Sequence, residues 1–260
     1  MYWNPSPVLL EIGPLSIRWY GLLFAGGFLV SYFLLARVFV RDNLSRAPLE
    51  PLFWTIFWGT LLGARLGHIL FYEPAYYFSH PLEILAVWHG GLASHGGAIG
   101  IVIGFLIFFR KNPHLDRWAV LDRLAIIVPV AAGFIRLGNL MNSEIIGRPS
   151  DLPWAFVFAR VDLLPRHPAQ LYEALAYFCI GGVLYFLHNH FPRRNGLNFG
   201  AMLALIFGFR FFVEFLKEDQ TYFEAALPIN MGQILSIPFI IAGLGLAAWA
   251  YLRSSKSKAA

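Results

Sequence analysis

The sequence predicts an all-α, polytopic integral membrane protein. Of its 260 residues, 58% are hydrophobic and only 13% are charged, whereas a soluble domain carries about 25% charged residues. Apolar runs of about twenty residues, the length that a helix needs to cross a bilayer, recur along the chain. Basic residues gather in alternate connecting segments. Together these observations exclude an ordinary soluble domain.

The apolar runs divide into seven candidate transmembrane helices. Their approximate bounds are 16–38, 52–72, 94–110, 119–141, 168–190, 198–217 and 230–252. We expect a single seven-helix membrane domain over residues 1–260, with an extracytoplasmic loop at about 142–167. The single cysteine, Cys179, lies inside a span, so the sequence predicts no disulfide framework and no cysteine metal site.

The basic residues predict the orientation of the chain. Lys and Arg occur after the first, third and fifth spans and in the C-terminal tail, but are absent from residues 1–15 and 73–93. The positive-inside rule therefore places the N-terminus outside and the C-terminus in the cytoplasm. The 142–167 loop breaks this pattern, which suggests that its arginines serve function. Because topology explains the net charge of +5, it does not indicate nucleic-acid binding.

Arginines inside or at the ends of the spans are the most informative feature of the sequence. An arginine at the bilayer centre costs roughly 2.5–3.5 kcal/mol on insertion scales. With the orientation above, most polar residues of the spans fall in the outer half of the bilayer. Arg123 is the exception, explained by pairing with Asp122 or by snorkelling to the inner surface. The sequence thus predicts a lipid-embedded anion site. The five arginines are Arg18, Arg65, Arg123, Arg136 and Arg210.

The end of the fourth span predicts a phosphate site. Arg136, Asn139 and Asn142 are spaced by three, so they lie on adjoining parts of one helix face. The planar fork of an arginine suits a phosphate, and asparagine amides add orienting hydrogen bonds. The alternative is a helix end whose polar residues act as caps and interface anchors.

The third span opens with a histidine among glycines. Gly96, Gly100 and Gly104 are spaced by four, which predicts close packing against another helix. That packing does not explain His95, whose imidazole suits a proton acceptor. The alternative is a polar anchor at the membrane interface.

Three further groups have both a functional and a structural interpretation. Arg210 and Glu214 are four apart and can form an ion pair that lowers the cost of insertion, while the arginine still offers donors to a phosphate. Tyr20 suits an aromatic belt, and Gly63 and Gly67, which flank Arg65, suit small-residue packing. Gln170 and Glu173 open the fifth span, where helix capping is the simple explanation.

Several kinds of chemistry are excluded by missing motifs. The sequence has no HExxH motif and no paired cysteines for a metal. It has no GxSxG motif and no P-loop. The last span contains no lysine for a retinal Schiff base. We therefore expect no metal and no cofactor.

The stretch from Arg136 to Gly147 resembles the signature of the bacterial prolipoprotein diacylglyceryl transferase family. The arginine, both asparagines, Glu144 and Gly147 match, while Ile135 and Leu140 stand where the family has glycine and phenylalanine. Other matching segments follow in the family's order and cover nearly the whole chain. They are Arg18–Gly21, Gly63–Gly67, Ser94–Gly97, His167–Glu173, and Arg210 with Glu214.

The resemblance implies a transferase of lipoprotein maturation in the bacterial cytoplasmic (inner) membrane. Such an enzyme moves the diacylglyceryl group of phosphatidylglycerol to the lipobox cysteine thiol of a preprolipoprotein and releases glycerol phosphate. The expected partners are phosphatidylglycerol, the preprolipoprotein signal peptide and membrane lipids, with no nucleic acid. The active site would face the outer leaflet, and the nucleophilic thiol would belong to the partner.

The same resemblance suggests roles for individual residues. Arg136 and Arg210 would bind the phosphate, and His95 would accept the thiol proton, although a water coupled to an arginine is an open alternative. It also stays open whether Arg65 touches lipid or only braces the helices. The catalytic residues are thus His95, Arg136 and Arg210, and the substrate-binding residues are Tyr20, Arg65, Asn139, Asn142, Glu144, Gly147 and Glu214.

A transporter or channel for an anionic solute is the alternative function, because it would also use intramembrane arginines. Transporters show internal repeats and interrupted helices near the midplane. This sequence shows no convincing repeat, and its polar layer lies toward one face of the membrane.

Overall fold

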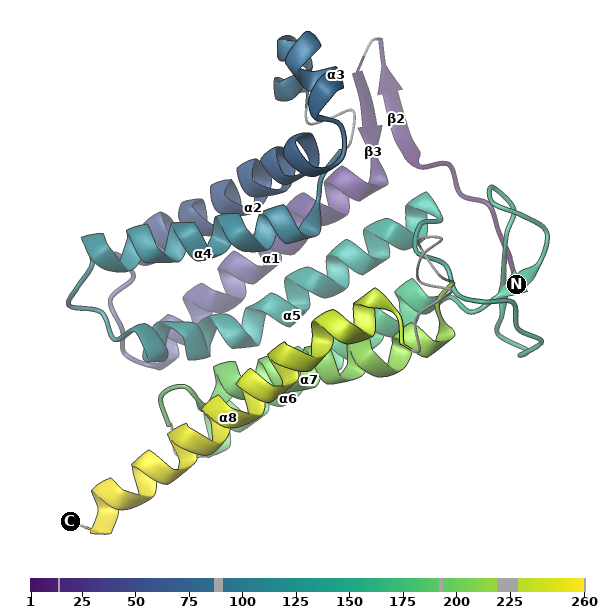
Figure 1. The fold of residues 1–260 in the computed structure, drawn as a ribbon. Helices are drawn as coiled ribbons and strands as arrows, with labels where there is room; N and C mark the ends of the chain where they lie inside the picture. The colour runs from purple at the N-terminus through teal and green to yellow at the C-terminus, as the bar shows by residue number, and fades with distance from the viewer. Residues whose placement is uncertain (14, 87–90, 192–193, 219–228, 260) are drawn as a thin grey trace. The chain divides into compact units, whose positions relative to one another are not determined.

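A computed structural model describes residues 1–13, 15–86, 91–191, 194–218 and 229–259. The chain is mostly helical and divides into two compact units (Figure 1). Unit 1 comprises Met1–Leu35 and Trp118–Ala260, and unit 2 comprises Ala36–Arg117. We describe each unit by itself.

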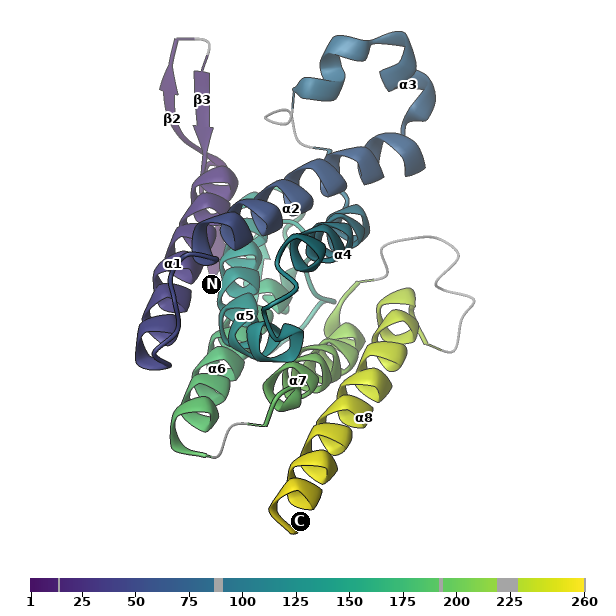
Figure 2. The ribbon, with the colours of Figure 1, turned by 90° about the vertical axis from the view of Figure 1, so that its left-hand side faces the viewer.

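Unit 1 is built on long helices. They are α1 (Trp19–Arg41, whose last residues belong to unit 2), α5 (Arg117–Asn142), α6 (Ala169–His190), α7 (Leu197–Val213) and α8 (Met231–Ala259). The 3₁₀ turn η3 (Glu214–Leu216) extends α7. Helices α7 and α8 lie side by side (Figures 1 and 2). They pack closely because a Cβ atom on Gly200 would lie 2.6 Å from the Ala247 nitrogen.

Two small sheets were not predicted from the sequence. Strands β2 (Val8–Ile12) and β3 (Leu15–Arg18) form an antiparallel hairpin. Strand β4 (Phe156–Phe158) pairs in parallel with β1 (Tyr2–Trp3) and antiparallel with β5 (Pro165–Arg166). The helix predicted from residue 16 therefore begins at Trp19, because residues 15–18 are a strand.

The 142–167 segment has a hydrophobic core of its own. Leu140, Ile146, Phe156 and Phe158 form a buried cluster, against which Trp3 packs. The indole Nε1 of Trp3 also donates to the Leu140 carbonyl at 3.0 Å. The longest connection of the chain is thus a packed structure that fixes the backbone next to the end of α5.

Unit 2 holds a closely packed helix pair. Its elements are α2 (Leu49–Phe71), α3 (Pro74–Ser79), the 3₁₀ turn η1 (Pro81–Leu85) and α4 (Ser94–Lys111). A Cβ atom on Gly67 would lie 2.7 Å from the Cα of Gly96, and one on Gly63 would lie 2.9 Å from the Cα of Gly100. The predicted glycine packing of the third span is therefore confirmed, with α2 as its partner (Figure 2).

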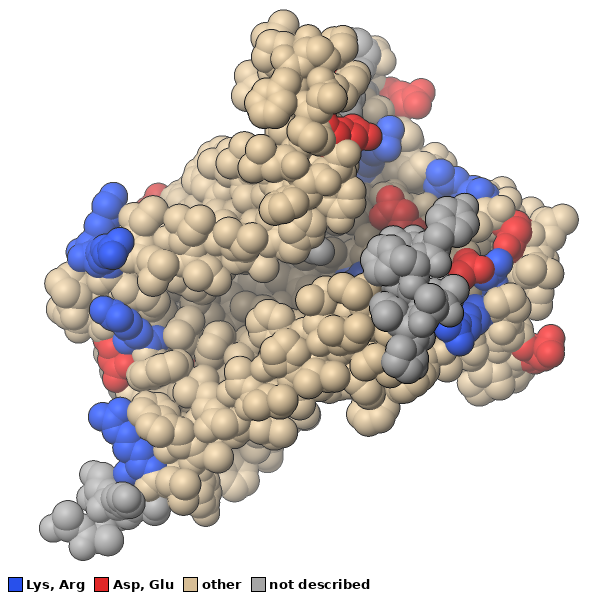
Figure 3. All heavy atoms as spheres, viewed as in Figure 1, with Lys and Arg blue, Asp and Glu red and all other residues tan. Residues whose placement is uncertain are grey.

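Five of the seven predicted spans are long and apolar enough to cross a membrane. They are Trp19–Arg41, Arg117–Asn142, Ala169–His190, Leu197–Leu216 and Met231–Arg253. The other two, now α2 and α4, are helical but are not in this set. Helix α4 has only 18 residues. It begins with polar residues and ends with basic ones. On the face shown in Figure 3, charged side chains gather at the helix ends and the flanks between them are uncharged.

Candidate functional site

Arg136 lies near the end of α5 and meets a buried carboxylate of α6. Its Nε atom is 3.3 Å from Oε2 of Glu173, whose side chain is 0% exposed. The phenol of Tyr177, one turn further along α6, donates to Oε1 of the same carboxylate at 3.1 Å. A buried carboxylate is tolerated only when it is paired and hydrogen-bonded, and Glu173 meets both conditions.

A lysine continues this pairing to the end of α7. The Nζ atom of Lys217 lies 3.2 Å from Oε2 of Glu173 and 3.0 Å from Oε1 of Glu214. Glu214 in turn lies 3.7 Å from Nη2 of Arg210, whose side chain is 33% exposed. The predicted pair of Arg210 and Glu214 is thus present, within a longer row of alternating charges. We call this row the charged chain: Arg136, Glu173, Lys217, Glu214 and Arg210.

Two asparagines connect Arg136 to a further carboxylate. Nη1 of Arg136 donates to Oδ1 of Asn139 at 3.3 Å. The amides of Asn139 and Asn142 then donate to the two oxygens of Glu144, each at 3.1 Å. The expected common face of these residues is therefore present. Because Glu144 is exposed, the carboxylate at this end of the network reaches solvent.

The turn that carries Glu144 has an unusual backbone. Ser143 and Ile145, on either side of it, both have φ of 56°. The left-handed region is a genuine outlier for a β-branched residue such as isoleucine. The Glu144 nitrogen donates to the Asn139 carbonyl at 3.0 Å, and the Gln170 amide donates to the Glu144 carbonyl. These bonds hold the carboxylate of Glu144 toward the asparagines.

Gly147 lies where three segments meet and has no room for a side chain. A Cβ atom there would lie 2.5 Å from the Cβ of His167 and 2.8 Å from the Leu216 carbonyl oxygen. Its nitrogen donates to the His167 carbonyl at 3.0 Å. Gly147 also forms an isolated antiparallel bridge with Lys217. The absence of a side chain thus allows the segment that carries Lys217 to reach the loop.

Arginines of the 142–167 loop reinforce the same junction. Arg148 donates through Nε to the Lys217 carbonyl at 2.9 Å. Arg166 pairs with Asp162 and lies 3.1 Å from Glu218, and it also donates to the Gly147 carbonyl at 3.3 Å. The hydrogen bond from Arg166 lowers the pKa of Asp162, and the same bond raises the pKa of Arg166. These two arginines hold the loop against residues 216–218.

Tyr20 is half-buried at the start of α1 and packs on α5. A Cβ atom on Gly138 would lie 2.9 Å from Cδ2 of the Tyr20 ring. Because Gly138 directly precedes Asn139, the ring lies beside the asparagine network. Unit 1 therefore brings together eight of the ten residues predicted for the site. They are Tyr20, Arg136, Asn139, Asn142, Glu144, Gly147, Arg210 and Glu214.

Arg65 belongs to unit 2 and has a different environment. It is 4% exposed, and its guanidinium donates to the carbonyls of Ile84 at 3.0 Å and Gly91 at 3.2 Å and to that of Glu83. It also lies over the ring of Tyr77, with 4.8 Å between Cζ and the centroid. Arg65 thus fastens η1 and Gly91 onto α2.

His95 also belongs to unit 2, at the start of α4. It is exposed, and its ring lies 5.2 Å from that of Phe71 and 5.9 Å from that of Tyr72. Its role as a proton acceptor remains a prediction.

The sequence analysis did not assign Glu173 and Lys217 to the site. Capping of α6 was the simple interpretation of Gln170 and Glu173, and it is wrong. The N-cap is Pro168, and no side chain caps the helix. The sequence does contain one signal for Glu173: a carboxylate inside a predicted span needs a cation as its partner. Lys217 gave no such signal because it stands at the last residue of a predicted span.

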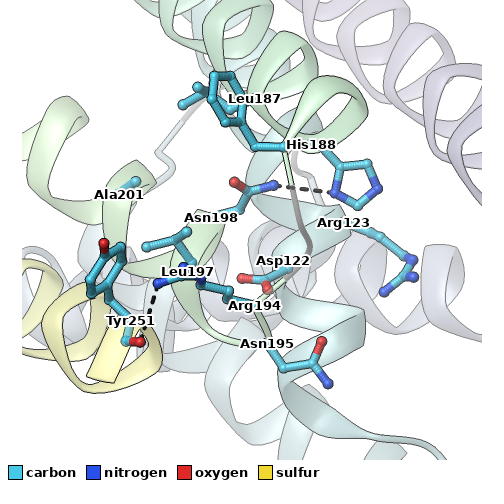
Figure 4. A pocket seen from close by; sticks show the side chains of 11 residues that line it. Asp122, Arg123, Leu187, His188, Arg194, Asn195, Leu197, Asn198, Ala201 and Tyr251 are labelled. Carbon is cyan, nitrogen blue, oxygen red and sulfur yellow. Dashed lines mark hydrogen bonds between the residues drawn. The ribbon is translucent and has the colours of Figure 1, made fainter. Parts of the chain in front are cut away.

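A pocket lies at the other end of unit 1. It measures about 280 Å³ and is lined by Asp122, Arg123, His188, Asn198 and Tyr251 among others (Figure 4). Asp122 accepts from the nitrogens of Gly196 and Phe199, each at 2.8 Å, and so stabilises the start of α7. Asp122 and Arg136 are fourteen residues apart on α5, or about 21 Å at 1.5 Å per residue. This pocket is therefore separate from the charged chain.

Comparison with known proteins gives a consistent result. A profile described as prolipoprotein diacylglyceryl transferase matches residues 7–249. The chain belongs to the prolipoprotein diacylglyceryl transferase family. It is 46% identical to a phosphatidylglycerol–prolipoprotein diacylglyceryl transferase of Tolumonas auensis, over 100% of this chain and 99% of that protein. It is 47% identical to the protein of that name from Chloroherpeton thalassium, over 94% and 92%. With its counterpart from Bacteroides fragilis it shares 48%, over 93% and 92%.

The family's signature segment lies at one end of unit 1. The segment that matched the family's signature, Arg136 to Gly147, contains the asparagine network, the left-handed turn and the glycine junction. The remaining charged groups come from α6, from α7, from the turn η3 and from Lys217 directly after it. The charged chain and this network therefore form the candidate active site.

Proposed function

We propose that this protein transfers the diacylglyceryl group of phosphatidylglycerol to the lipobox cysteine of a preprolipoprotein, the first step of lipoprotein maturation. It is a transferase. Two kinds of observation support this function. The first is identity of 46–48% to proteins that carry this activity in their names, over nearly their full lengths. The second is the charged chain, which supplies cations for an anionic lipid headgroup.

The observation that carries the proposal is the position of two arginines at the ends of one ionic chain. Arg136 and Arg210 each pair with a glutamate, and Lys217 joins the two glutamates. Guanidinium groups bind phosphate oxygens through paired donors. They also stabilise the negative charge that develops on the departing glycerol phosphate.

In the proposed reaction, the lipobox sulfur attacks the carbon of the diacylglyceryl group that bears the phosphate ester. A carbon–sulfur bond forms and the carbon–oxygen bond to phosphate breaks, with the electron pair leaving on glycerol phosphate. The thiol must lose its proton, and its free pKa is about 8.5. His95 accepts that proton directly or through water. The nucleophile belongs to the protein substrate, so the mechanism needs no catalytic cysteine of the enzyme.

The remaining residues orient the headgroup. Tyr20, Asn139 and Asn142 offer a hydroxyl and amides beside Arg136, and Glu144 fixes both amides. Gly147 allows the loop and residues 216–218 to meet. For Arg65, left open between lipid contact and bracing, the bonds to three backbone carbonyls favour bracing.

We also propose a topology for this function. All seven predicted helices would span the bacterial cytoplasmic (inner) membrane as one domain, with the N-terminus outside and the C-terminus in the cytoplasm. The 142–167 loop would then be extracytoplasmic, and the active site would face the outer leaflet. This arrangement is supported by the distribution of basic residues. Membrane lipids and the signal peptide of the substrate would be its partners.

The test is transfer by the full-length protein in detergent micelles. Phosphatidylglycerol and a peptide with a lipobox cysteine are mixed with the protein, and the peptide mass is measured. The expected result is a mass increase of one diacylglyceryl group, which depends on phosphatidylglycerol. A peptide with serine in place of the cysteine is the matched control. An unchanged mass would favour the alternative function, a transporter or channel for an anionic solute.

A further inference from the structure

Lys217 is the most deeply buried basic residue in the described part of the chain, and the proposed reaction steps give it no role. Its side chain is 2% exposed, and its ammonium lies between the carboxylates of Glu173 and Glu214. Its backbone is held separately, by the bridge to Gly147 and by the bond from Arg148 to its carbonyl. A buried charge needs close pairing and further hydrogen bonds to be stable. The position of this ammonium is therefore fixed from two directions.

The charges of the five residues in the charged chain do not cancel, and Lys217 is the reason. Arg136, Arg210 and Lys217 are positive, whereas Glu173 and Glu214 are negative, which leaves a surplus of one positive charge. Without Lys217, the two carboxylates would balance the two guanidiniums. Glu144 lies outside this count because it is exposed to solvent and held by neutral amides. A phosphodiester headgroup without an amine carries one negative charge.

We propose that Lys217 is a positioning residue that makes the site select an anionic phospholipid over a zwitterionic one. Its ammonium holds both glutamates and offsets one of their charges, so that Arg136 and Arg210 retain the surplus for the phosphate. Lys217 acts through the glutamates and does not touch the reacting atoms. This inference rests on the proposed function, because it explains how the same site chooses its lipid.

A purely structural clamp would depend on the shape of Lys217, whereas charge selection depends on the surplus. Three variants separate the two explanations. Lys217→Arg keeps the charge. Lys217→Gln removes the positive charge and leaves the charged chain with no net charge. The double variant Lys217→Gln with Glu173→Gln restores a surplus of one positive charge while breaking the ionic contacts further.

The experiment measures two quantities for the full-length protein and each variant in detergent micelles. One is the binding of fluorescent phosphatidylglycerol and of fluorescent phosphatidylcholine, which has a zwitterionic headgroup. The other is the KM and kcat of transfer to a lipobox peptide. Lys111→Gln is the matched control, because it removes an exposed lysine at the end of α4. Circular dichroism and thermal unfolding check the fold of each variant.

We expect Lys217→Gln to lose about tenfold or more of the preference for phosphatidylglycerol, the change that one close charge interaction produces. Its KM should rise more than its kcat falls. Lys217→Arg and Lys111→Gln should stay near the wild-type protein, and the double variant should regain preference relative to Lys217→Gln. An unchanged preference in Lys217→Gln, or a double variant with less preference than the single one, would overturn the proposal.

The role of Lys217 can still be tested if Lys217→Gln does not fold or if the wild-type protein shows no transfer. If Lys217→Gln does not fold, the double variant decides: wild-type lipid preference supports the charge explanation, and its loss overturns it. If the wild-type protein prefers phosphatidylglycerol but transfers nothing, the proposed function fails. The binding measurements then still support or overturn the role of Lys217.

Discussion

Two arginines of this protein are stabilised in different ways. Arg65 in unit 2 donates to three backbone carbonyls and lies over an aromatic ring. Arg136 in unit 1 pairs with the carboxylate of Glu173 and with the amide oxygen of Asn139. The three carbonyl partners of Arg65 are neutral and belong to the backbone, whereas the partners of Arg136 named above are side chains that other charged and polar groups share.

We interpret this difference as two roles for an arginine inside a predicted span: structure for Arg65 and, under the proposed function, chemistry for Arg136. Carbonyls of a turn cannot leave without unfolding the turn, so the bonds of Arg65 are part of the fold. Glu173 is also held by Lys217 and Tyr177, so it keeps partners when Arg136 turns toward a substrate. We therefore expect substitutions of Arg136 to affect turnover and substitutions of Arg65 to affect stability.

The largest expected effect is that of Arg136→Ala. Removing one charge-stabilising donor costs about 10²–10³ in kcat, and we expect transfer of the diacylglyceryl group to fall by at least that factor. The rate is measured by the mass shift of a lipobox peptide. Arg117→Ala is the control, because it removes an exposed arginine from the start of the same helix. Near-normal turnover would show that Arg136 is not a catalytic residue, and the proposed difference from Arg65 would then be wrong.

The next effect tests whether unit 2 supplies chemistry as well as bracing. His95→Gln keeps a polar side chain but removes the proton acceptor, and general base catalysis contributes about 10²–10⁴ in rate. We expect kcat to fall by about 10² with a smaller change in KM for phosphatidylglycerol. His80→Gln, an exposed histidine of unit 2, serves as the control. If His95→Gln retains the full rate, a water coupled to an arginine is the base instead.

Arg65→Met should act mainly on stability. Methionine keeps the apolar length of the side chain but leaves the carbonyls of Glu83, Ile84 and Gly91 without this donor. A lost bond to a charged group costs about 1.5–3 kcal/mol, so we expect unfolding to become easier by about 3 kcal/mol in thermal unfolding of the micelle-bound protein. The folded fraction should keep its kcat within about threefold. A stable variant with a much higher KM for phosphatidylglycerol would show instead that Arg65 contacts lipid.

The smallest effect concerns the ion pair between Asp162 and Arg166. Because the folded pKa of Asp162 is lowered, its contribution to stability is present above the unfolded pKa of about 3.9 and is lost as the pH falls through the folded value. The Asp162 side chain is partly exposed, so Asp162→Asn should cost at most about 1 kcal/mol at pH 7. Thermal unfolding at pH 7 and below pH 4 measures this. An equal difference from wild type at both values would contradict the assignment.

The sequence was sufficient for those features that depend on local patterns. Apolar runs located the seven long helices, although α8 runs on to Ala259 and the short α3 was not predicted. The spacing of Arg210 and Glu214 predicted their ion pair. The glycines at intervals of four predicted the close approach of α4 to another helix. Three-residue spacing placed Arg136 and Asn139 on one face. In all these cases the interacting residues are close in sequence or follow a helical period.

The remaining features depend on contacts between distant segments. Lys217 meets Glu173 across 44 positions, and no period in the sequence relates the two. The parallel pairing of β1 with β4 joins residue 2 to residue 157, through strands of two and three residues that are too short to show alternation. The left-handed φ of Ile145 was unpredictable for a different reason, because a β-branched residue normally disfavours it.

The alternation of charges also constrains how this protein can diverge. Within the charged chain, loss of Glu173 or Glu214 alone leaves three cations with one carboxylate, so part of the positive charge is uncompensated. Viable descendants should therefore exchange these residues in pairs. A relative that has lost the acidic residue at position 173 or 214 is expected to have lost the basic one at position 217 as well. Correlated substitution at these three positions would make the ion pairs of residue 217 with residues 173 and 214 detectable from related sequences alone.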